Sequence, residues 1–337
     1  MDRLKILQIL PMYHPEGEKV LNQLAEVKKF DEFNEQQIIQ FLDNNIVDGI
    51  ILRAPAAITQ AILDHCTGVR AISGAGVGLD NIDVNYATEK GIAILNAPSL
   101  NSQATAEHTV SLIMAVMKNI PSFNEETKKG NFSYRDGRYT HEMHGKKVGL
   151  IGFGNIAQKV GKILSAGFGM EVTAYVRTIS GEREKLAKAM NVELTTSIEQ
   201  LFQESDIVSL HIPLQKETER IIDRSLLSLM KKEAILVNTA RGGLINEEDL
   251  IEVLENGDII GAGLDVFTQE PPPKDHPFFR LKQVVATPHI GGISMEAAKK
   301  TSVTIARNLV SALDGNDVPT IVNGGSLKRK VHGLSPQ

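Results

Sequence analysis

The sequence predicts an α/β protein that contains two doubly wound parallel sheets. Short apolar runs rich in isoleucine and valine alternate with amphipathic stretches of helical period. This rhythm is typical of βαβ units, whose parallel sheet is covered by helices on both faces. The alternation occurs in two series, with a long apolar-faced helix between them, and 337 residues suffice for two domains of ordinary size.

The first series supplies the elements of one domain. We expect strands at 4–10, 49–52, 71–73 and 92–95, and helices at 18–29, 35–44 and 57–66. Cys66 closes the last of these helical patterns, and we interpret it as a buried thiol. Residues 101–119 form the long helix that leads into the second series.

The second series begins near Lys147. Its strands are expected at 148–151, 172–176, 207–210, 235–238, 263–265 and 284–286, with helices after Gly154, Gly181, Ser197, Asp223 and Asn246. A last helix at 294–313 follows. If this helix returns to the first domain, that domain is discontinuous, formed by 1–100 and 291–337, with 101–290 inserted as a continuous domain. We expect the tail from Gly324 to be flexible and its basic run to be solvated.

Composition argues against several kinds of partner. A net charge of -5 and a pI near 6.0 give no electrostatic reason to expect nucleic acid or an anionic membrane. No apolar run reaches the roughly 18 residues of a membrane span, and the first residues lack the pattern of a signal peptide. A single cysteine allows no internal disulfide. We therefore expect a soluble, cytoplasmic protein.

A glycine-rich turn opens the second series in the segment KKVGLIGFGNIAQKVGKIL. Gly152, Gly154 and Ala157 give the pattern G-x-G-x-x-G/A between a strand and a helix. The glycines permit a tight turn and let backbone amides approach a pyrophosphate at the helix N-terminus, where Asn155 and Ile156 lie. This context predicts a dinucleotide site.

The stretch EVTAYVRTIS that follows bears on which dinucleotide binds. An NAD site usually ends this strand with a carboxylate for the ribose 2′-hydroxyl, but 172–180 contains none. Arg177 offers several donors to a 2′-phosphate and Thr178 a hydroxyl, with Ser180 and Arg183 close behind. These residues favour NADP(H). NAD(H), or a solvated loop with a chance arginine, stays open.

Three segments place reactive side chains after expected strands of the second series. They are AILVNTARGGLIN with Arg241, GAGLDVFTQEPPP with Asp265 and Glu270, and VVATPHIGG with His289. Arg241 could hold a carboxylate and polarise a carbonyl. His289 could exchange a proton with a carbonyl oxygen, and a nearby glutamate would stabilise its imidazolium. Taken singly, each residue has an equally good structural explanation.

Together these motifs resemble the D-isomer-specific 2-hydroxyacid dehydrogenase family over residues 45–323. The carrying segments are GLIGFGNIA, DIVSLHIPL, LVNTARGGLIN, GAGLDVFTQEP and TPHIGG, with GAGVGLDNID and GIAILNAPSLNSQATAEHT in the first domain. The resemblance implies two Rossmann-like domains, a discontinuous substrate (catalytic) domain and an inserted dinucleotide-binding domain. It also implies hydride transfer between a nicotinamide cofactor and a small 2-oxo or D-2-hydroxy acid.

The resemblance assigns roles residue by residue. Arg241, Glu270 and His289 match the family's catalytic residues, and Asp265 matches its contact to the nicotinamide carboxamide. Substrate contacts are implied for Arg53, Val77 and Gly78. Positions that line the cofactor groove are Thr105, His211, Pro213, Thr239 and Ala240. No metal is implied.

Differences from particular members of the family narrow the range of expected substrates and cofactors. Relatives that oxidise formate carry glutamine in place of Glu270, and relatives that oxidise phosphite carry lysine in place of Val77. We see no regulatory domain after the last helix, unlike the long phosphoglycerate dehydrogenases. The missing acid near Val176 resembles the NADP-using glyoxylate and hydroxypyruvate reductases, which we favour.

Two alternatives stay open. One is an NAD-linked phosphoglycerate-type dehydrogenase, for which Arg53 is a single candidate phosphate contact. The other is a dinucleotide-sensing, co-repressor-like interaction module, which the intact catalytic residues do not exclude. We interpret His108 as structural and expect no metal site at His141 and His144. The family is generally dimeric, and 121–145 is the expected dimer arm.

Overall fold

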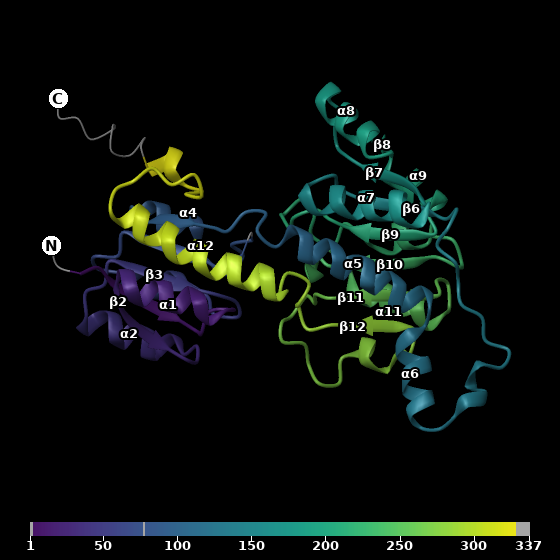
Figure 1. The fold of residues 1–337 in the computed structure, drawn as a ribbon, viewed down its shortest axis with the longest axis horizontal. Helices are drawn as coiled ribbons and strands as arrows, with labels where there is room; N and C mark the ends of the chain where they lie inside the picture. The colour runs from purple at the N-terminus through teal and green to yellow at the C-terminus, as the bar shows by residue number, and fades with distance from the viewer. Residues whose placement is uncertain (1–2, 77, 328–337) are drawn as a thin grey trace. The chain divides into compact units, whose positions relative to one another are not determined.

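The computed structural model describes residues 3–76 and 78–327, and the chain divides into two compact units. Unit 1 comprises Met1–Asn101 and Ile293–Gln337, and unit 2 comprises Ser102–Gly292. Each unit has its own parallel sheet with helices packed on it (Figure 1). The predicted fold class of two parallel-sheet α/β domains is therefore confirmed.

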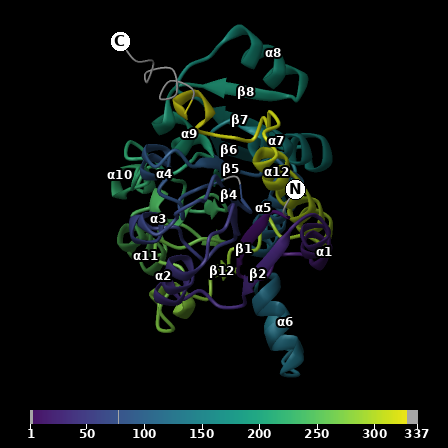
Figure 2. The same cartoon turned by 90° about the vertical axis from the view of Figure 1, so that its left-hand side faces the viewer.

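Unit 1 contains a five-stranded sheet in the order β2-β1-β3-β4-β5. Its strands are β1 (Lys5–Ile9), β2 (Glu26–Phe30), β3 (Gly49–Leu52), β4 (Ala71–Gly74) and β5 (Ala93–Leu95). Its helices are α1 (Pro15–Leu24), α2 (Glu35–Asn44), α3 (Gln60–Asp64), α4 (Val84–Glu89) and α12 (Met295–Leu313). Helix α12 lies beside α1 (Figures 1 and 2). Gly17 permits this approach, because a Cβ there would lie 2.4 Å from the Cβ of Ser302.

The helix predicted at 18–29 is wrong in its second half. The helix ends at Leu24, and the chain continues as strand β2 at the edge of the sheet. Glu26, Lys28 and Lys29 are exposed there. Charged residues are typical of edge strands, because they discourage pairing with other chains. They also hide the apolar alternation by which a strand is recognised.

Unit 2 contains a seven-stranded sheet in the order β12-β11-β10-β9-β6-β7-β8. Its strands are β6 (Lys147–Ile151), β7 (Glu171–Tyr175), β8 (Val192–Thr195), β9 (Ile207–Leu210), β10 (Ile235–Asn238), β11 (Gly261–Leu264) and β12 (Val284–Ala286). The six strands predicted for this series are confirmed, and β8, an edge strand, was not predicted.

Helices cover both faces of the second sheet. They are α5 (Ser102–Met117), α6 (Ile120–Lys128), α7 (Asn155–Phe168), α8 (Gly181–Ala189), α9 (Ile198–Glu204), α10 (Arg224–Leu227) and α11 (Glu247–Glu255), with 3-10 turns η1 (Phe132–Arg135), η2 (Gly242–Leu244) and η3 (Pro277–Arg280). One core cluster joins α5 and α7 to the sheet, and another joins α9, α10 and α11 to its opposite face (Figure 2). Because all seven strands are parallel, their carboxyl ends lie at one edge of the sheet, and α5 is packed against β10, β11 and β12.

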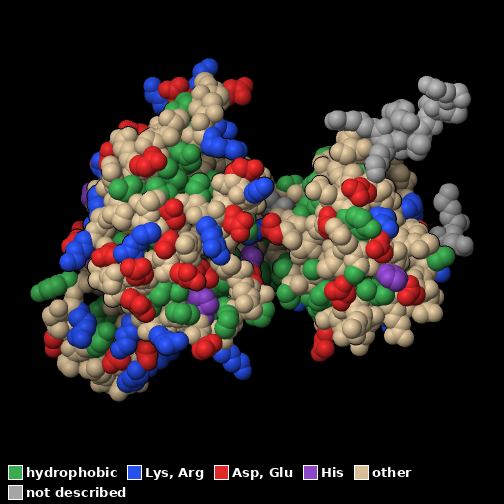
Figure 3. Space-filling view, turned by 180° about the vertical axis from the view of Figure 1, so that it is seen from behind, with side chains coloured by type: hydrophobic (Ala, Val, Ile, Leu, Met, Phe, Trp, Pro, Cys, Tyr) green, Lys and Arg blue, Asp and Glu red, His purple; other side chains and the backbone are tan. Residues whose placement is uncertain are grey.

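Residues 324–327 form a short helical turn, because the amides of Ser326 and Leu327 donate to the carbonyl of Asn323. The prediction of a flexible tail from Gly324 is wrong for these four residues, and the basic run at 328–330 lies outside the described residues. On the face shown in Figure 3, acidic and basic side chains are interspersed on both units. Within the described part of the chain, every helix is too short or too polar to cross a bilayer.

Candidate active site

Four of the reactive side chains singled out in the sequence follow three neighbouring strands of unit 2. Arg241 follows β10, Asp265 and Glu270 follow β11, and His289 follows β12. These strands are adjacent and parallel in the sheet. The carboxyl ends of parallel strands form the edge where ligands bind in doubly wound sheets. The sheet order therefore gathers residues that are up to 48 positions apart (289 − 241).

His289 and Glu270 form a direct pair, with 2.7 Å between Nδ1 of the histidine and Oε2 of the carboxylate. Oε1 of Glu270 accepts a hydrogen bond from the Phe267 amide at 3.1 Å. Burial is the largest single influence on Glu270 and raises its pKa, but the bond and charge of His289, the Phe267 amide and the charge of Arg241 together lower the pKa below its ordinary value. Glu270 is therefore a carboxylate that orients the imidazole and leaves Nε2 for another partner.

The turn that carries Arg241 is packed against the backbone of the loop that carries Glu270. A Cβ on Gly242 would lie 1.9 Å from the carbonyl carbon of Phe267, so only glycine permits this approach. The side-chain amide of Asn238 donates to the carbonyl of Arg241 at 2.8 Å, which closes the turn. Nη1 of Arg241 donates to the carbonyl of Ala240 at 2.6 Å. Arg241 is thus held close enough to Glu270 for its positive charge to lower the pKa of that carboxyl group.

Asp265 is a buried clasp for the turn that carries His289. It is 1% exposed, and its carboxylate accepts from the Ile290 amide at 2.9 Å, the Gly291 amide at 2.8 Å and the Thr287 hydroxyl at 2.6 Å. Burial is the largest single influence on the pKa of Asp265 and raises it. The hydrogen bonds from these donors and from His108 outweigh burial together, so the pKa lies below its ordinary value. The predicted contact of Asp265 with a nicotinamide carboxamide stays a prediction.

The glycine turn has the geometry of an anion-binding helix start. Gly152 has a φ of +104°, and a Cβ there would lie 2.8 Å from the carbonyl oxygen of His211. Gly154 caps α7, and a Cβ built on it meets no described atom within 4 Å, so the space above this helix end is open. Ala157 is fully buried against the sheet. The first turn of α7, with Asn155 and Ile156, therefore fits a pyrophosphate.

The residues after β7 have the exposure that a nucleotide contact requires. The position where an acid was expected is Val176, which is 6% exposed. Arg177 and Thr178 are exposed. Nη1 of Arg183 donates to the carbonyl of Thr178 at 2.7 Å, and Ser180 caps α8. Arg183 therefore supports the loop, while Arg177 extends from it into solvent.

The remaining residues assigned to the cofactor groove are placed by the ends of β9 and β10 and by α5. The hydroxyls of Thr109 and Thr239 are 2.8 Å apart, and the Thr109 hydroxyl donates to the carbonyl of Thr105. His211 shares a hydrogen bond of 3.0 Å with Ser209 through Nε2. Ala240 and Pro213 lie in the turns that follow these strands.

The imidazole of His211 is buried although the residue keeps some exposed surface. Its Nδ1 atom is covered and has no hydrogen-bond partner among the described residues. Burial lowers the pKa of His211 to about 3, because the charged form would lose its hydration. The ring is therefore neutral at physiological pH.

The implied substrate contacts Arg53 and Gly78 belong to unit 1. Arg53 follows β3, and its Nε and Nη1 atoms donate to the carbonyls of Pro11 and Ala54 at 2.5 and 2.8 Å. Its guanidinium also lies 5.2 Å from the ring centre of Tyr13. Much of its donor capacity is thus used within unit 1. Gly78 follows β4, and Val77 lies outside the described residues.

Glu247 and His276 support the site, and neither was found from the sequence. Oε1 of Glu247 accepts from the Thr268 amide at 2.9 Å, and its Oε2 lies 3.5 Å from Nε2 of His276. Both contacts hold the loop that carries Glu270. The sequence predicted only that a helix follows Asn246. It gave no signal for a contact 21 positions away.

Comparison with known proteins agrees with this geometry. Residues 110–291 match the model of the D-isomer specific 2-hydroxyacid dehydrogenase NAD binding domain. The chain is 38% identical to D-3-phosphoglycerate dehydrogenase of Methanocaldococcus jannaschii, over 99% of this chain and 62% of that protein. It is 35% identical to glyoxylate reductase of Pyrococcus furiosus, over 95% of this chain and 96% of that protein.

Solved structures give the same result. An acyclic imino acid reductase in complex with NADPH and D-Arg matches with a TM-score of 0.83 and 33% identity, over 95% of this chain and all of that one. The chain therefore belongs to the D-isomer specific 2-hydroxyacid dehydrogenase family. It spans about three fifths of the Methanocaldococcus relative and nearly the whole of the Pyrococcus relative.

Proposed function

We propose that this chain transfers a hydride between a nicotinamide cofactor and C2 of a small 2-oxo acid, and that it reduces glyoxylate, hydroxypyruvate or a similar acid with NADPH. The observation that carries the proposal is the His289–Glu270 pair beside Arg241, on the same sheet edge as the glycine turn. The Pyrococcus relative, named glyoxylate reductase, supports the substrate class.

The residues of unit 2 suit this chemistry. A nicotinamide dinucleotide whose pyrophosphate is held by the glycine turn would supply or accept the hydride. Arg241 binds the substrate carboxylate and polarises the keto oxygen. His289, whose Nδ1 is oriented by the Glu270 carboxylate 2.7 Å away, donates its Nε2 proton to that oxygen. Arg53 and the Gly78 amide of unit 1 are proposed as further substrate contacts, as the family resemblance implies.

NADPH is the favoured cofactor because of the residues that follow β7. Val176 is buried where a carboxylate would repel a 2′-phosphate, and Arg177 is exposed one residue later. The NADPH complex of the acyclic imino acid reductase supports the proposal. Use of NADH stays open.

A cytoplasmic location fits the unpaired, buried thiol of Cys66, whose pKa burial raises to about 12.

The decisive experiment is a matrix of kcat/KM values with NADH and NADPH against glyoxylate, hydroxypyruvate, its 3-phospho derivative, pyruvate and bulkier 2-oxo acids. His289→Ala should lower kcat for the best acid by roughly 100-fold or more, since general acid catalysis contributes about that much. His65→Ala, a histidine of unit 1 outside every proposed site, is the control and should turn over normally. Near-normal turnover of His289→Ala would refute the assigned role.

The same matrix separates the two alternatives. A strong preference for the phosphorylated acid with NADH would favour a phosphoglycerate-type dehydrogenase, as the name of the Methanocaldococcus relative suggests. The commitment of two Arg53 nitrogens to backbone carbonyls makes this residue a weak phosphate site by itself. No turnover with any acid, together with tight dinucleotide binding, would favour a sensing module.

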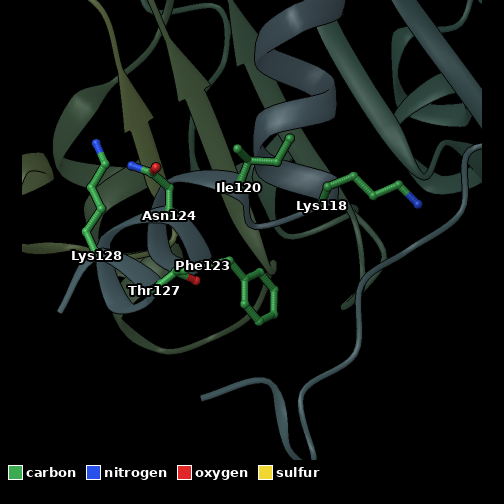
Figure 4. Close-up of a pocket in the computed structure, with 6 residues that line it drawn as sticks. All are labelled: Lys118, Ile120, Phe123, Asn124, Thr127 and Lys128. Carbon is green, nitrogen blue, oxygen red and sulfur yellow. The ribbon is translucent and has the colours of Figure 1, made fainter. Parts of the chain in front are cut away.

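We also propose a homodimer formed through the arm, which we define as the expected segment 121–145 of unit 2 together with residues 118–120 that precede it. None of the residues of α6 is buried, and the large apolar side chain of Ile120 is 52% exposed. Phe132 and Tyr139 farther along are 66% and 92% exposed. Figure 4 shows Ile120 and Phe123 of α6 among the residues that line one pocket, together with Asn124, Thr127, Lys118 and Lys128. Apolar side chains exposed in this way are typical of a subunit interface.

A further inference from the structure

His108 contacts the clasp around His289 from helix α5. Its side chain is 18% exposed, and its Nε2 atom lies 3.0 Å from the Thr287 hydroxyl and 3.3 Å from Oδ1 of Asp265. Helix α5 is packed against β11 and β12, which end directly before Asp265 and Thr287. A side chain 157 positions away (265 − 108) therefore reaches the buried carboxylate.

The hydrogen atoms of this cluster can be assigned by counting donors. The Thr287 hydroxyl has a single hydrogen, and the bond of 2.6 Å to Oδ1 of Asp265 uses it. The threonine oxygen can then only accept from His108. Nε2 of His108 must carry a hydrogen to interact with either neighbour, because the Asp265 carboxylate is itself only an acceptor. His108 is therefore a donor, and it joins Thr287 and two backbone amides around one carboxylate.

These donors bracket His289 in the chain. Thr287 lies two residues before it, and the amides of Ile290 and Gly291 follow it directly. The amide of His289 itself donates to the carbonyl of Asp265 at 2.8 Å. His289 has a φ of +53°, in the left-handed region that is unfavourable for a non-glycine residue. The clasp therefore holds the acid/base residue in a conformation that it would otherwise leave.

The packing around Gly291 shows how closely His108 and the turn are joined. A Cβ on Gly291 would lie 2.8 Å from Oδ2 of Asp265 and 3.2 Å from Cδ2 of His108. The backbone after His289 thus rests directly on both side chains. A change at His108 that removed its donor or altered its shape would therefore reach this backbone through the carboxylate of Asp265.

We propose that His108 is a positioning residue for His289, and that it acts through Asp265 and Thr287 to fix the turn that carries the acid/base imidazole. Its kinetic consequence rests on the proposed function, whereas its effect on the turn does not. The role is that of a donor, so a side chain that keeps an N–H near the position of Nε2 should preserve it, and an apolar side chain of similar size should not.

The first test compares His108→Leu with His108→Gln. Loss of a hydrogen bond to a charged group costs about 1.5–3 kcal/mol, so His108→Leu should lower kcat for 2-oxo acid reduction by roughly 10- to 100-fold. The Kd for NADPH, measured by fluorescence, should change less than about threefold. His108→Gln should recover most of the loss in kcat. Equal losses in both variants, or a loss confined to Kd, would overturn the proposal.

The second test needs no activity. Hydrogen–deuterium exchange at the Ile290 and Gly291 amides should speed up in His108→Leu and stay near the wild-type rate in His108→Gln and in the control His65→Leu. Thr287→Val should accelerate the same amides, and the double variant with His108→Leu should add little, because both residues act on one carboxylate. Unchanged exchange in His108→Leu and Thr287→Val would refute the clasp, even if no substrate were found.

Discussion

Asp265 and Glu270 are carboxylates five positions apart whose surroundings give them different tasks. Asp265 is 1% exposed and accepts hydrogen bonds from two backbone amides and two side chains, so it orders the chain around it. The side chain of Glu270 is 35% exposed and faces the imidazole of His289, so it orients that ring. The sequence shows two acids near a strand end, and only the donors around each one separate the carboxylate that orders the chain from the one that faces an imidazole.

Cofactor preference is expected to depend on Arg177. Replacing it with alanine removes the exposed guanidinium that we propose as the partner of the 2′-phosphate. The ratio of kcat/KM with NADPH to that with NADH should fall by about tenfold or more, since a hydrogen bond to a charged group is worth roughly 1.5–3 kcal/mol. Lys188→Ala, a basic residue on the last turn of α8, is the control. An unchanged ratio in Arg177→Ala would contradict the proposed cofactor site.

Among the elements, the turn at Gly242 between β10 and α11 places the strictest limit on side-chain size. In Gly242→Ala the new methyl group would collide with the backbone of Phe267, which cannot rotate away. We expect a loss of about 2–3 kcal/mol in the free energy of unfolding and a large loss of kcat, because the Arg241 and Glu270 loops must separate.

Gly243→Ala provides a matched control for this prediction. The added Cβ would lie 3.0 Å from Cδ2 of Leu214, the far end of a flexible side chain. Urea unfolding should show a change of less than about 1 kcal/mol. If both variants were equally stable, the close approach of the two loop backbones would not be needed.

The end of strand β9 should make stability depend on pH through His211. Its pKa of about 3 in the folded chain lies below the ordinary value of 6.5, so the unfolded chain binds this proton first as pH falls. The contribution is complete above pH 6.5 and is lost toward pH 3 at about 1.4 kcal/mol per pH unit. Urea unfolding at pH 7 and pH 5 should therefore show a drop that is about 2 kcal/mol smaller in His211→Gln. His141→Gln should retain the wild-type drop.

Most elements could be predicted from sequence, and both strands that were missed lie at the edge of a sheet. Central strands such as β3 and β10 are continuous apolar runs, because helices cover both of their faces. The edge strands β2 and β8 have one neighbour each and carry Lys28, Lys29 and Glu193, so their pattern is hidden. The helix expected at 57–66 is confined to Gln60–Asp64, where Thr59 caps its first turn.

At the scale of the whole molecule, the exposed arm leads to a prediction about assembly. The double variant Ile120→Glu, Phe132→Glu places two charges on side chains that are 52% and 66% exposed. If the arm is the interface, sedimentation equilibrium should show the wild-type chain as a dimer and the variant as a monomer, because desolvating unpaired charges opposes association.

Leu24→Glu tests whether any added charge has this effect. Leu24 is 43% exposed on α1 of unit 1, away from the arm in the chain. This variant should sediment as the wild-type chain does. A monomeric wild-type chain at micromolar concentration would count against the proposed homodimer.

The sequence by itself determined the two parallel-sheet series, the glycine turn and the missing acid at Val176. Each of these is encoded by residues within a few positions of one another, through apolar periodicity, backbone freedom or side-chain chemistry. The assignment of Arg241, Glu270 and His289 rests instead on a resemblance that extends over most of the chain. Only the tertiary structure decided which distant groups meet. His108 reaches Asp265, Glu247 reaches Thr268, and Gly242 lies against Phe267, because the order of strands and the packing of α5 bring them together. Such contacts leave no local pattern in the chain, since they depend on the whole sheet being formed.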